Sequence, residues 1–131
     1  MHYGLIGKSL VHSLSPEIHA ALIPGISYAC RELPSEAAVH AFLKSRAFSG
    51  VNVTVPYKRT VLEDLDWLSP TAQAIGAVNC IVQRERKLYG YNTDFTGLDT
   101  MLKRHAVVLQ GRTVAILGTG GAARCAAYVV R

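Results

Sequence analysis

The sequence contains few cysteines, and their spacing fits neither a disulfide framework nor a zinc site. Cys30, Cys80 and Cys125 are odd in number and lie far apart among apolar residues. Disulfide-rich secreted domains and structural zinc sites both depend on closely spaced, paired cysteines. The histidines show no metal-ligand spacing either. We therefore expect a protein of a reducing compartment, with no metal site.

Long apolar runs are also missing. No stretch approaches the roughly 20 apolar residues that a bilayer-spanning helix needs, although 50% of the chain is hydrophobic. Met1 leads almost directly into the strand-like residues 3–6, without the basic and then apolar segments of a secretory leader. These absences predict a cytoplasmic protein that does not associate with membranes.

Charge is sparse and unclustered. Charged residues make up 18% of the chain, with a formal net charge of +5, and the longest basic cluster is Arg84-Glu-Arg-Lys87. Nucleic-acid-binding proteins usually gather lysine and arginine into a patch or stripe. We therefore expect no nucleic-acid partner. A modest positive field suits anionic small molecules, such as a carboxylate substrate and a phosphorylated cofactor.

Strand-like and helix-like segments alternate along the chain, which is typical of an α/β fold with a parallel sheet. We expect Ser15 to cap the first helix, with Pro16 in its first turn. The predicted strands are residues 3–6, 26–33 and 50–54, and the predicted helices are residues 16–23 and 36–45.

The second part of the chain has a different pattern. Residues 77–91 form two strand-like runs around a charged turn, which favours a hairpin. A helix is expected from Asp94 to about His105, capped by Thr93 or Asp94. An apolar strand over 112–117 and a helix from Gly121 follow. A domain boundary is expected within or just after the helix that ends near His105.

Two polar islands interrupt this apolar chain, and the first is Asn52-Val-Thr-Val-Pro-Tyr-Lys58. Strand alternation puts Asn52 and Thr54 on one side of the strand and Val51, Val53 and Val55 on the other. Buried polar groups at a strand end need partners, because each unsatisfied one costs about 1–3 kcal/mol. An isolated lysine here would simply be solvated, so Lys58 is a candidate catalytic residue because of its polar neighbours.

Three further polar features each allow a structural or a functional interpretation. Ser13 and Ser15, two residues apart, could hold both oxygens of one carboxylate, or belong to an ordinary capped loop. Asn79 could be a satisfied core amide, and Asp94 only a helix cap. If the fold brings these four residues close to Lys58, together they would form a binding site.

Gly118-Thr-Gly-Gly-Ala-Ala123 fits the dinucleotide-binding pattern G-x-G-x-x-G/A between a strand and a helix. Gly118 would make the tight turn, Gly120 would let backbone amides approach a pyrophosphate, and Ala123 would allow close packing. The residue that separates NAD from NADP is expected roughly 20 residues beyond the glycines. It would lie past Arg131, so the sequence leaves this preference open.

Five motifs together resemble the shikimate dehydrogenase family in order and approximate spacing. They are Ser13-Leu-Ser15-Pro16, Asn52-Val-Thr-Val-Pro-Tyr-Lys58, Gly76-Ala-Val-Asn79, Asn92-Thr-Asp94 and Gly118-Thr-Gly-Gly-Ala122. The resemblance implies a three-layer α-β-α substrate domain with a mainly parallel sheet over residues 1–105. Residues 106–131 would be the first β-Gly-loop-α unit of a Rossmann domain that binds NADP.

The resemblance also implies residue roles. Ser13 and Ser15 would bind the shikimate carboxylate, and Lys58 would be the catalytic acid or base, oriented by Asp94. The ring hydroxyls would be held by Thr54, Asn79 and Asp94. The cofactor would be bound by Gly118, Thr119, Gly120, Gly121 and Ala122.

The implied activity is the reversible, NADPH-dependent reduction of 3-dehydroshikimate to shikimate in chorismate and aromatic amino acid biosynthesis, by a protein that could be a homodimer. Two alternatives stay open: a quinate or quinate/shikimate dehydrogenase, and a non-catalytic binding module that keeps the old pocket. Cys80 departs from the family, which usually has threonine there, and is expected to be core packing. Because most of a dinucleotide domain is missing, we expect this chain to be part of a longer enzyme and inactive alone.

Overall fold

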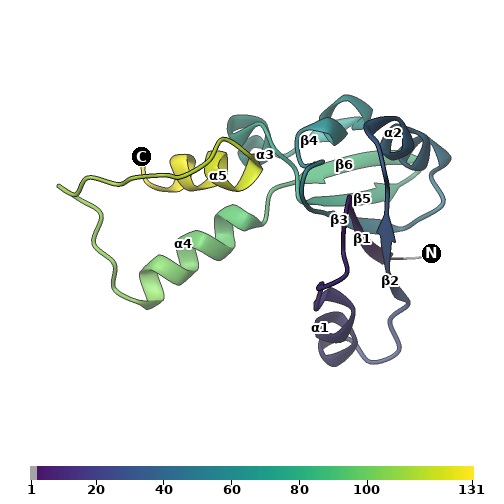
Figure 1. The fold of residues 1–131 in the computed structure, drawn as a ribbon, viewed down its shortest axis with the longest axis horizontal. Helices are drawn as coiled ribbons and strands as arrows, with labels where there is room; N and C mark the ends of the chain where they lie inside the picture. Colours follow the sequence, from purple (N-terminus) through teal and green to yellow (C-terminus); the bar gives the residue numbers. More distant parts are fainter. Residues whose placement is uncertain (1–2) are drawn as a thin grey trace.

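A computed structural model describes residues 3–131 as a six-stranded sheet flanked by helices, with strand order β2-β1-β3-β5-β6-β4 (Figure 1). The strands are β1 (Tyr3–Gly7), β2 (Tyr28–Glu32), β3 (Gly50–Val53), β4 (Trp67–Leu68), β5 (Cys80–Arg84) and β6 (Lys87–Tyr91). The helices are α1 (Ser15–Leu22), α2 (Glu36–Ser45), α3 (Pro70–Ile75), α4 (Asp94–Arg104), α5 (Gly121–Val129) and the short 3₁₀ helix η1 (Thr60–Asp64). None of these helices, over residues 3–131, is long and apolar enough to cross a membrane.

The sheet is mixed but mostly parallel. Strand β1 pairs in parallel with β2 and β3, and β4 pairs in parallel with β6. Strand β5 runs antiparallel to both β3 and β6. The predicted α/β class and the predicted hairpin, formed by β5 and β6 around the turn at Glu85 and Arg86, are therefore confirmed.

One face of the sheet carries the main core. Helix α2 covers it because Val39, Phe42 and Leu43, at helical spacing, are buried together against the strands. Ser35 caps this helix by accepting a hydrogen bond from the Ala38 amide at 3.2 Å. The strand residues in this core are Ile6, Val51, Val53, Ile81 and Leu88.

The opposite face is covered more thinly, by α1 (Figure 1). His19 of α1 stacks on Tyr28 of β2 with ring centroids 3.9 Å apart. Beside this contact the sheet face borders a cavity of about 540 Å³, lined in part by Tyr3, Asn52 and Cys80. The three layers are present, and the second helical layer leaves part of the sheet open.

The side-chain cap hydrogen bonds predicted for α1 and α4 do not form. Ser15 lies inside α1, and its amide donates to Ser13 Oγ at 3.3 Å, while the cap position Leu14 has no side-chain cap. At α4, Thr93 occupies the predicted cap position but makes no side-chain cap hydrogen bond, and Asn92 Oδ1 accepts from the Phe95 amide at 3.2 Å instead. The side chains of Thr93 and Asp94 are engaged elsewhere, in the network described below.

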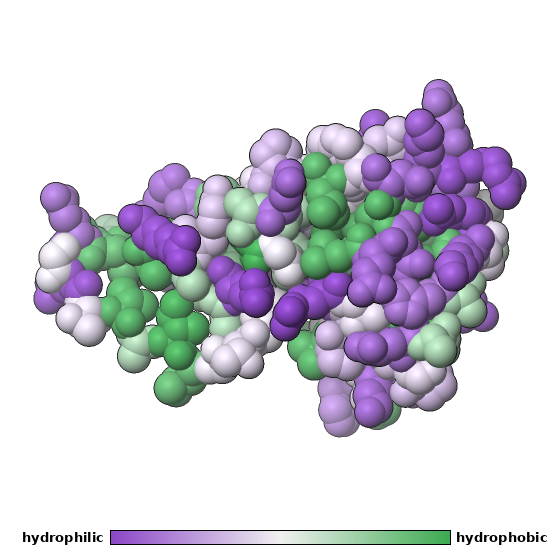
Figure 2. Space-filling model, turned by 90° about the horizontal axis from the view of Figure 1, so that it is seen from above, coloured by the Kyte–Doolittle hydropathy of each residue, from purple (hydrophilic) through white to green (hydrophobic). Residues whose placement is uncertain are grey.

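The predicted strand at 112–117 is also wrong, whereas the helix beginning at Gly121 is confirmed as α5. Residues 106–120 contain only turns and irregular backbone, and Leu117 is 97% exposed. A strand needs a neighbour to satisfy its amides and carbonyls, and no strand in residues 3–131 lies beside this segment. Figure 2 shows apolar side chains gathered at the end of the molecule that this segment, α4 and α5 form.

A substitution at Gly90 of β6 tests how closely the core packs against the sheet. A Cβ added there would lie 2.9 Å from Leu68 Cδ2 and 3.0 Å from Val78 Cγ2, so Gly90→Ala overpacks the core. We expect a loss of about 1–3 kcal/mol in the free energy of unfolding, measured by urea denaturation. Gly97→Ala, in open space on α4, is the control and is expected to stabilise by up to about 1 kcal/mol. Equal effects of the two substitutions would contradict this packing.

Candidate active site

Three residues that are distant in the sequence meet in one hydrogen-bonded network. Lys58 Nζ donates to Asp94 Oδ2 at 2.6 Å, and Asn79 Nδ2 donates to Asp94 Oδ1 at 2.8 Å. Lys58 lies in the turn after β3, Asn79 directly precedes β5, and Asp94 begins α4. The side chain of Asp94 is therefore a shared acceptor, as the polar islands of the sequence predicted, and not a helix cap.

Backbone hydrogen bonds fix the positions of these residues. The main-chain amide of Asn79 donates to Tyr91 O at 3.0 Å, and its carbonyl accepts from Val53 N at 2.8 Å. Its side-chain Oδ1 accepts from the Thr93 amide at 2.8 Å. The carbonyl of Lys58 accepts from Val78 N at 2.8 Å. The network is thus preorganised by the ends of three strands.

The ion pair is half-buried and keeps an open side. The Lys58 side chain is 16% exposed and that of Asp94 is 34% exposed. An ammonium has three N–H donors, and in this structure Asp94 takes one of them. Partial burial strengthens charge-assisted hydrogen bonds. The arrangement can present a proton donor to a ligand oxygen at the molecular surface.

A second set of polar groups lines a cavity of about 340 Å³ at the end of β1. Ser13, Ser15 and Thr54 all face it, together with Ser9 and His12. Four hydroxyl groups around one cavity suit the two oxygens of a carboxylate or neighbouring alcohols. The structure thus brings the predicted serines together with Thr54. Lys58, Asn79 and Asp94 do not line this cavity.

Asn52 and Tyr28 connect the two sets, and Tyr28 was missed in the sequence. The Tyr28 hydroxyl donates to Asn52 Oδ1 at 2.9 Å, and Asn52 Nδ2 donates to the Asn79 carbonyl at 3.5 Å. Burial raises the pKa of Tyr28 to about 12, while a hydrogen bond with Ser15 acts in the opposite direction. A tyrosine within a short strand gives no sequence signal for such a contact, because it depends on how α1 packs on β2.

Alternation along β3 is confirmed only within the strand. Val51 and Val53 are buried in the core, and Asn52 points the other way, toward Tyr28. The expectation for Val55 is wrong, since it is 70% exposed. The strand ends at Val53, and the turn that follows carries Lys58 toward Asp94.

The glycine-rich turn lies beside this network. Gly118 has φ of 118°, a backbone conformation that favours glycine, and the start of α5 has no side-chain cap. Uncapped amides at a helix N-terminus suit an anionic group. Gly121 lies against the side chain of Lys58. The turn therefore fits a phosphate, and its position brings such a group near the lysine.

Two other features do not belong to the network. Burial raises the pKa of the Cys80 thiol, which disfavours a thiolate nucleophile and agrees with the expected role of Cys80 in packing.

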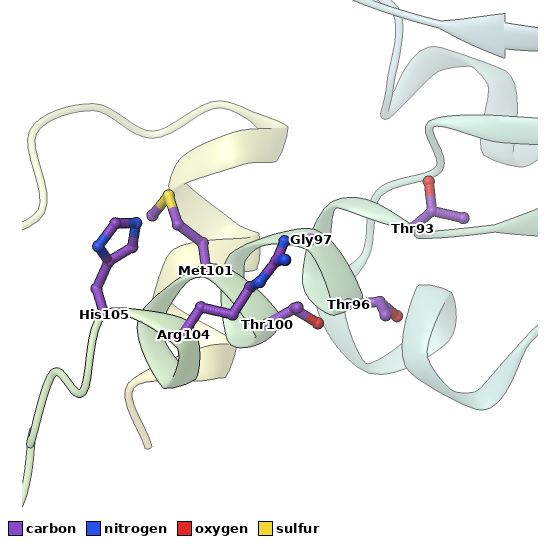
Figure 3. A pocket seen from close by; sticks show the side chains of 7 residues that line it. All are labelled: Thr93, Thr96, Gly97, Thr100, Met101, Arg104 and His105. Atoms are coloured by element: carbon purple, nitrogen blue, oxygen red, sulfur yellow. The ribbon is translucent and has the colours of Figure 1, made fainter. Parts of the chain in front are cut away.

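A cavity of about 490 Å³ lies along α4, lined by residues that include Thr96, Thr100 and Arg104 (Figure 3). Of its lining residues, Thr93 alone also bonds to Asn79.

Comparison with known proteins decides the family. The family model described as the shikimate dehydrogenase substrate binding domain matches residues 5–81, more than half of the chain. This chain belongs to the shikimate dehydrogenase family. The shikimate dehydrogenase (NADP(+)) of Clostridium beijerinckii is 44% identical over 128 residues, which cover 93% of this chain and 47% of that protein.

Solved structures of shikimate dehydrogenases have the same fold as this chain. Shikimate dehydrogenase 1 from Peptoclostridium difficile superposes with a TM-score of 0.91 at 42% identity, over 99% of this chain and 51% of its own. The enzyme from Thermus thermophilus, solved with NADP(H) and shikimate, superposes with a TM-score of 0.87 at 42% identity, over 99% and 51%. The chain thus spans about half the length of the curated relatives it matches.

The raised pKa of Tyr28 gives a pH test of the link between α1 and the site. The ordinary value is 10.0 and the folded value is about 12. The stability linked to Tyr28 is therefore fully present below about pH 10 and is lost as the pH rises toward 12. The tyrosinate absorbance of the wild type minus that of Tyr28→Phe should titrate with a midpoint near 12. A midpoint near the ordinary value would show that Tyr28 is not held in this environment.

Proposed function

We propose that the chain is the substrate-binding half of a shikimate dehydrogenase that reduces 3-dehydroshikimate to shikimate with NADPH, in the route to chorismate and aromatic amino acids. The observation that supports this most strongly is the network of Lys58 and Asn79 around Asp94. Family membership and the ligands of the related solved structures support the choice of substrate and cofactor.

Substrate recognition follows from the two polar sets. Ser13 and Ser15 bind the ring carboxylate, and Thr54, Asn79 and Asp94 bind the hydroxyls. Each substrate hydroxyl then completes the hydrogen bonding of a partly buried polar group. An analogue that lacks one hydroxyl leaves that group unsatisfied and is rejected.

Lys58 acts as the general acid. A lysine ammonium is a proton donor, and a charge-assisted hydrogen bond of 2.6 Å from Lys58 Nζ to Asp94 Oδ2 holds it in place. As the ketone C=O bond opens, a new C–H and a new O–H bond form, and Lys58 donates the proton to the oxygen. In the reverse direction the neutral amine takes the proton back. Asp94 holds Nζ at the position where this transfer occurs.

The glycine turn is the proposed cofactor site, with Gly118, Thr119, Gly120, Gly121 and Ala122 around the pyrophosphate. An added Cβ at Gly120 would meet no atom within 4 Å, so its backbone is open to a ligand. Bound NADPH would supply the hydride. We assign residues 1–105 to the substrate domain and residues 106–131 to the start of the cofactor domain, and we expect no turnover by the chain alone.

Two alternatives and two further predictions accompany the proposal. A quinate or quinate/shikimate dehydrogenase would have the same network and is the alternative enzyme. A binding module without catalysis is disfavoured because Lys58 and Asp94 are both present and paired. We place the protein in the cytoplasm, and a homodimer stays a prediction.

Turnover by a completed enzyme tests the role of Lys58. We suggest a fusion of this chain to the C-terminal half of the Thermus thermophilus enzyme. Lys58→Ala should lower kcat by about 10²–10⁴-fold, the usual contribution of a general acid. Lys103→Ala is the control, because Lys103 also pairs with an aspartate, Asp99, at 2.7 Å but is 74% exposed. NADPH oxidation with 3-dehydroshikimate is the measurement.

The controls separate the alternatives. Full turnover by Lys58→Ala would contradict the proton-donor role. An active wild-type fusion that prefers quinate to shikimate would support the alternative enzyme. A folded wild-type fusion that binds shikimate and NADPH without turnover would favour the binding module.

A further inference from the structure

Gly121, the first residue of α5, lies directly against the side chain of Lys58. A Cβ built at this glycine would be 3.0 Å from Lys58 Cβ, 3.1 Å from Lys58 Cδ and 3.4 Å from Ala77 Cβ. The first two distances are shorter than ordinary van der Waals contact between carbon atoms. Any side chain at position 121 would therefore compete with the lysine for space.

The other glycines of the same turn show that this contact is particular to Gly121. Gly118 has φ of 118°, a backbone conformation that side chains disfavour, and this explains why position 118 is a glycine. Gly120 has φ of −76°, and an added Cβ there would meet nothing within 4 Å. Gly121 is helical, where alanine is normally favoured over glycine. The space taken by Lys58 explains why position 121 has no side chain.

Helix α5 cannot easily move away to make room. Cys125 of α5 is buried with Ile75 and Ala77 in a small core that Phe95 and Val129 cover. Phe95 also contacts Tyr128 edge to face, with ring centroids 5.4 Å apart. A larger residue at 121 would therefore displace the lysine stem before it displaced the helix.

The direction of the lysine stem decides where its ammonium lies. Lysine has four flexible side-chain torsions, and ordering them costs conformational entropy. Contact with Gly121 limits that freedom on one side, and Asp94 Oδ2 holds Nζ at 2.6 Å at the far end. We propose that Gly121 is a positioning residue for Lys58, which lets the stem lie flat against α5 so that the ammonium faces Asp94 and the substrate.

This inference rests on the proposed function, because it assigns Lys58 to substrate contact. It adds that the turn proposed for the cofactor also sets the position of the proton donor. Gly121 thus acts on shikimate binding through Lys58, even when no cofactor is bound.

Calorimetric titration of shikimate into the fusion enzyme, without NADP, tests this. Gly121→Ala should weaken binding about tenfold, as expected for one misplaced charge-assisted hydrogen bond. Gly97→Ala, at a helical glycine of α4 where an added Cβ would meet nothing within 4 Å, should leave shikimate affinity unchanged. In a double-mutant cycle, adding Gly121→Ala to Lys58→Ala should cost nothing further.

The outcomes distinguish this inference from the proposed function. If Lys58→Ala binds shikimate as tightly as the wild type, Lys58 does not contact bound shikimate and the positioning inference is overturned, whereas the proton-donor role is tested separately by turnover. If Lys58→Ala binds weakly but Gly121→Ala binds normally, only the positioning role is wrong. An equal loss from Gly121→Ala with and without Lys58 would show a general structural effect and also overturn the inference.

A folding measurement covers the case in which Gly121→Ala is unstable. Crowding against the lysine stem predicts that Lys58→Gly, which removes both contacting carbons, raises the Tm of the Gly121→Ala protein toward that of the Lys58→Gly protein alone. Thermal unfolding by circular dichroism is the readout. A Tm that stays low in the double variant would show that the crowding is with other atoms and would overturn the inference.

Discussion

The two hydrogen bonds to Asp94 require three residues from separate segments of the chain to lie side by side at one edge of the sheet. Lys58 follows β3, Asn79 precedes β5 and Asp94 begins α4 directly after β6. The β3-β5-β6 pairing satisfies this requirement, because antiparallel neighbours bring the end of one strand beside the start of the next. The core valines and the packing at Gly90 therefore serve the site by holding these strands in register.

Much of this arrangement could be predicted where local chemistry and tertiary structure agree. Helix α2 has a capping serine and an apolar stripe, and its bounds are those expected. The polar islands also indicated the network correctly, since Lys58, Asn79 and Asp94 are polar groups at strand and helix ends that need partners. One cavity is lined by Ser13, Ser15 and Thr54, which are also polar residues in the segments that follow strands.

The predictions from the sequence were wrong where the local structure depends on contacts with residues far away in the chain. The apolar run at 112–117 has the composition of a strand but no neighbour to pair with in residues 3–131. Thr93 is at the cap position of α4, yet Asn79 engages its side chain and Lys58 engages that of Asp94. The Asn92 side chain therefore accepts the free helix amide instead. Tyr28 was missed because its importance lies in a contact with Asn52 across the fold. Gly121 was expected only as part of the cofactor turn, and its closeness to Lys58 likewise depends on tertiary packing.

The most direct test of the account is a titration of the ¹⁵N-labelled 131-residue chain with shikimate, followed by two-dimensional NMR. We predict saturable shifts in the amide signals around Ser13, Thr54, Asn79 and Asp94, and no shift on the distant surface near His40. Quinate should give weaker shifts at the same positions. Saturable shifts confined to other surfaces, or an equal response to an unrelated carboxylate such as acetate, would contradict the assignment of this site to shikimate.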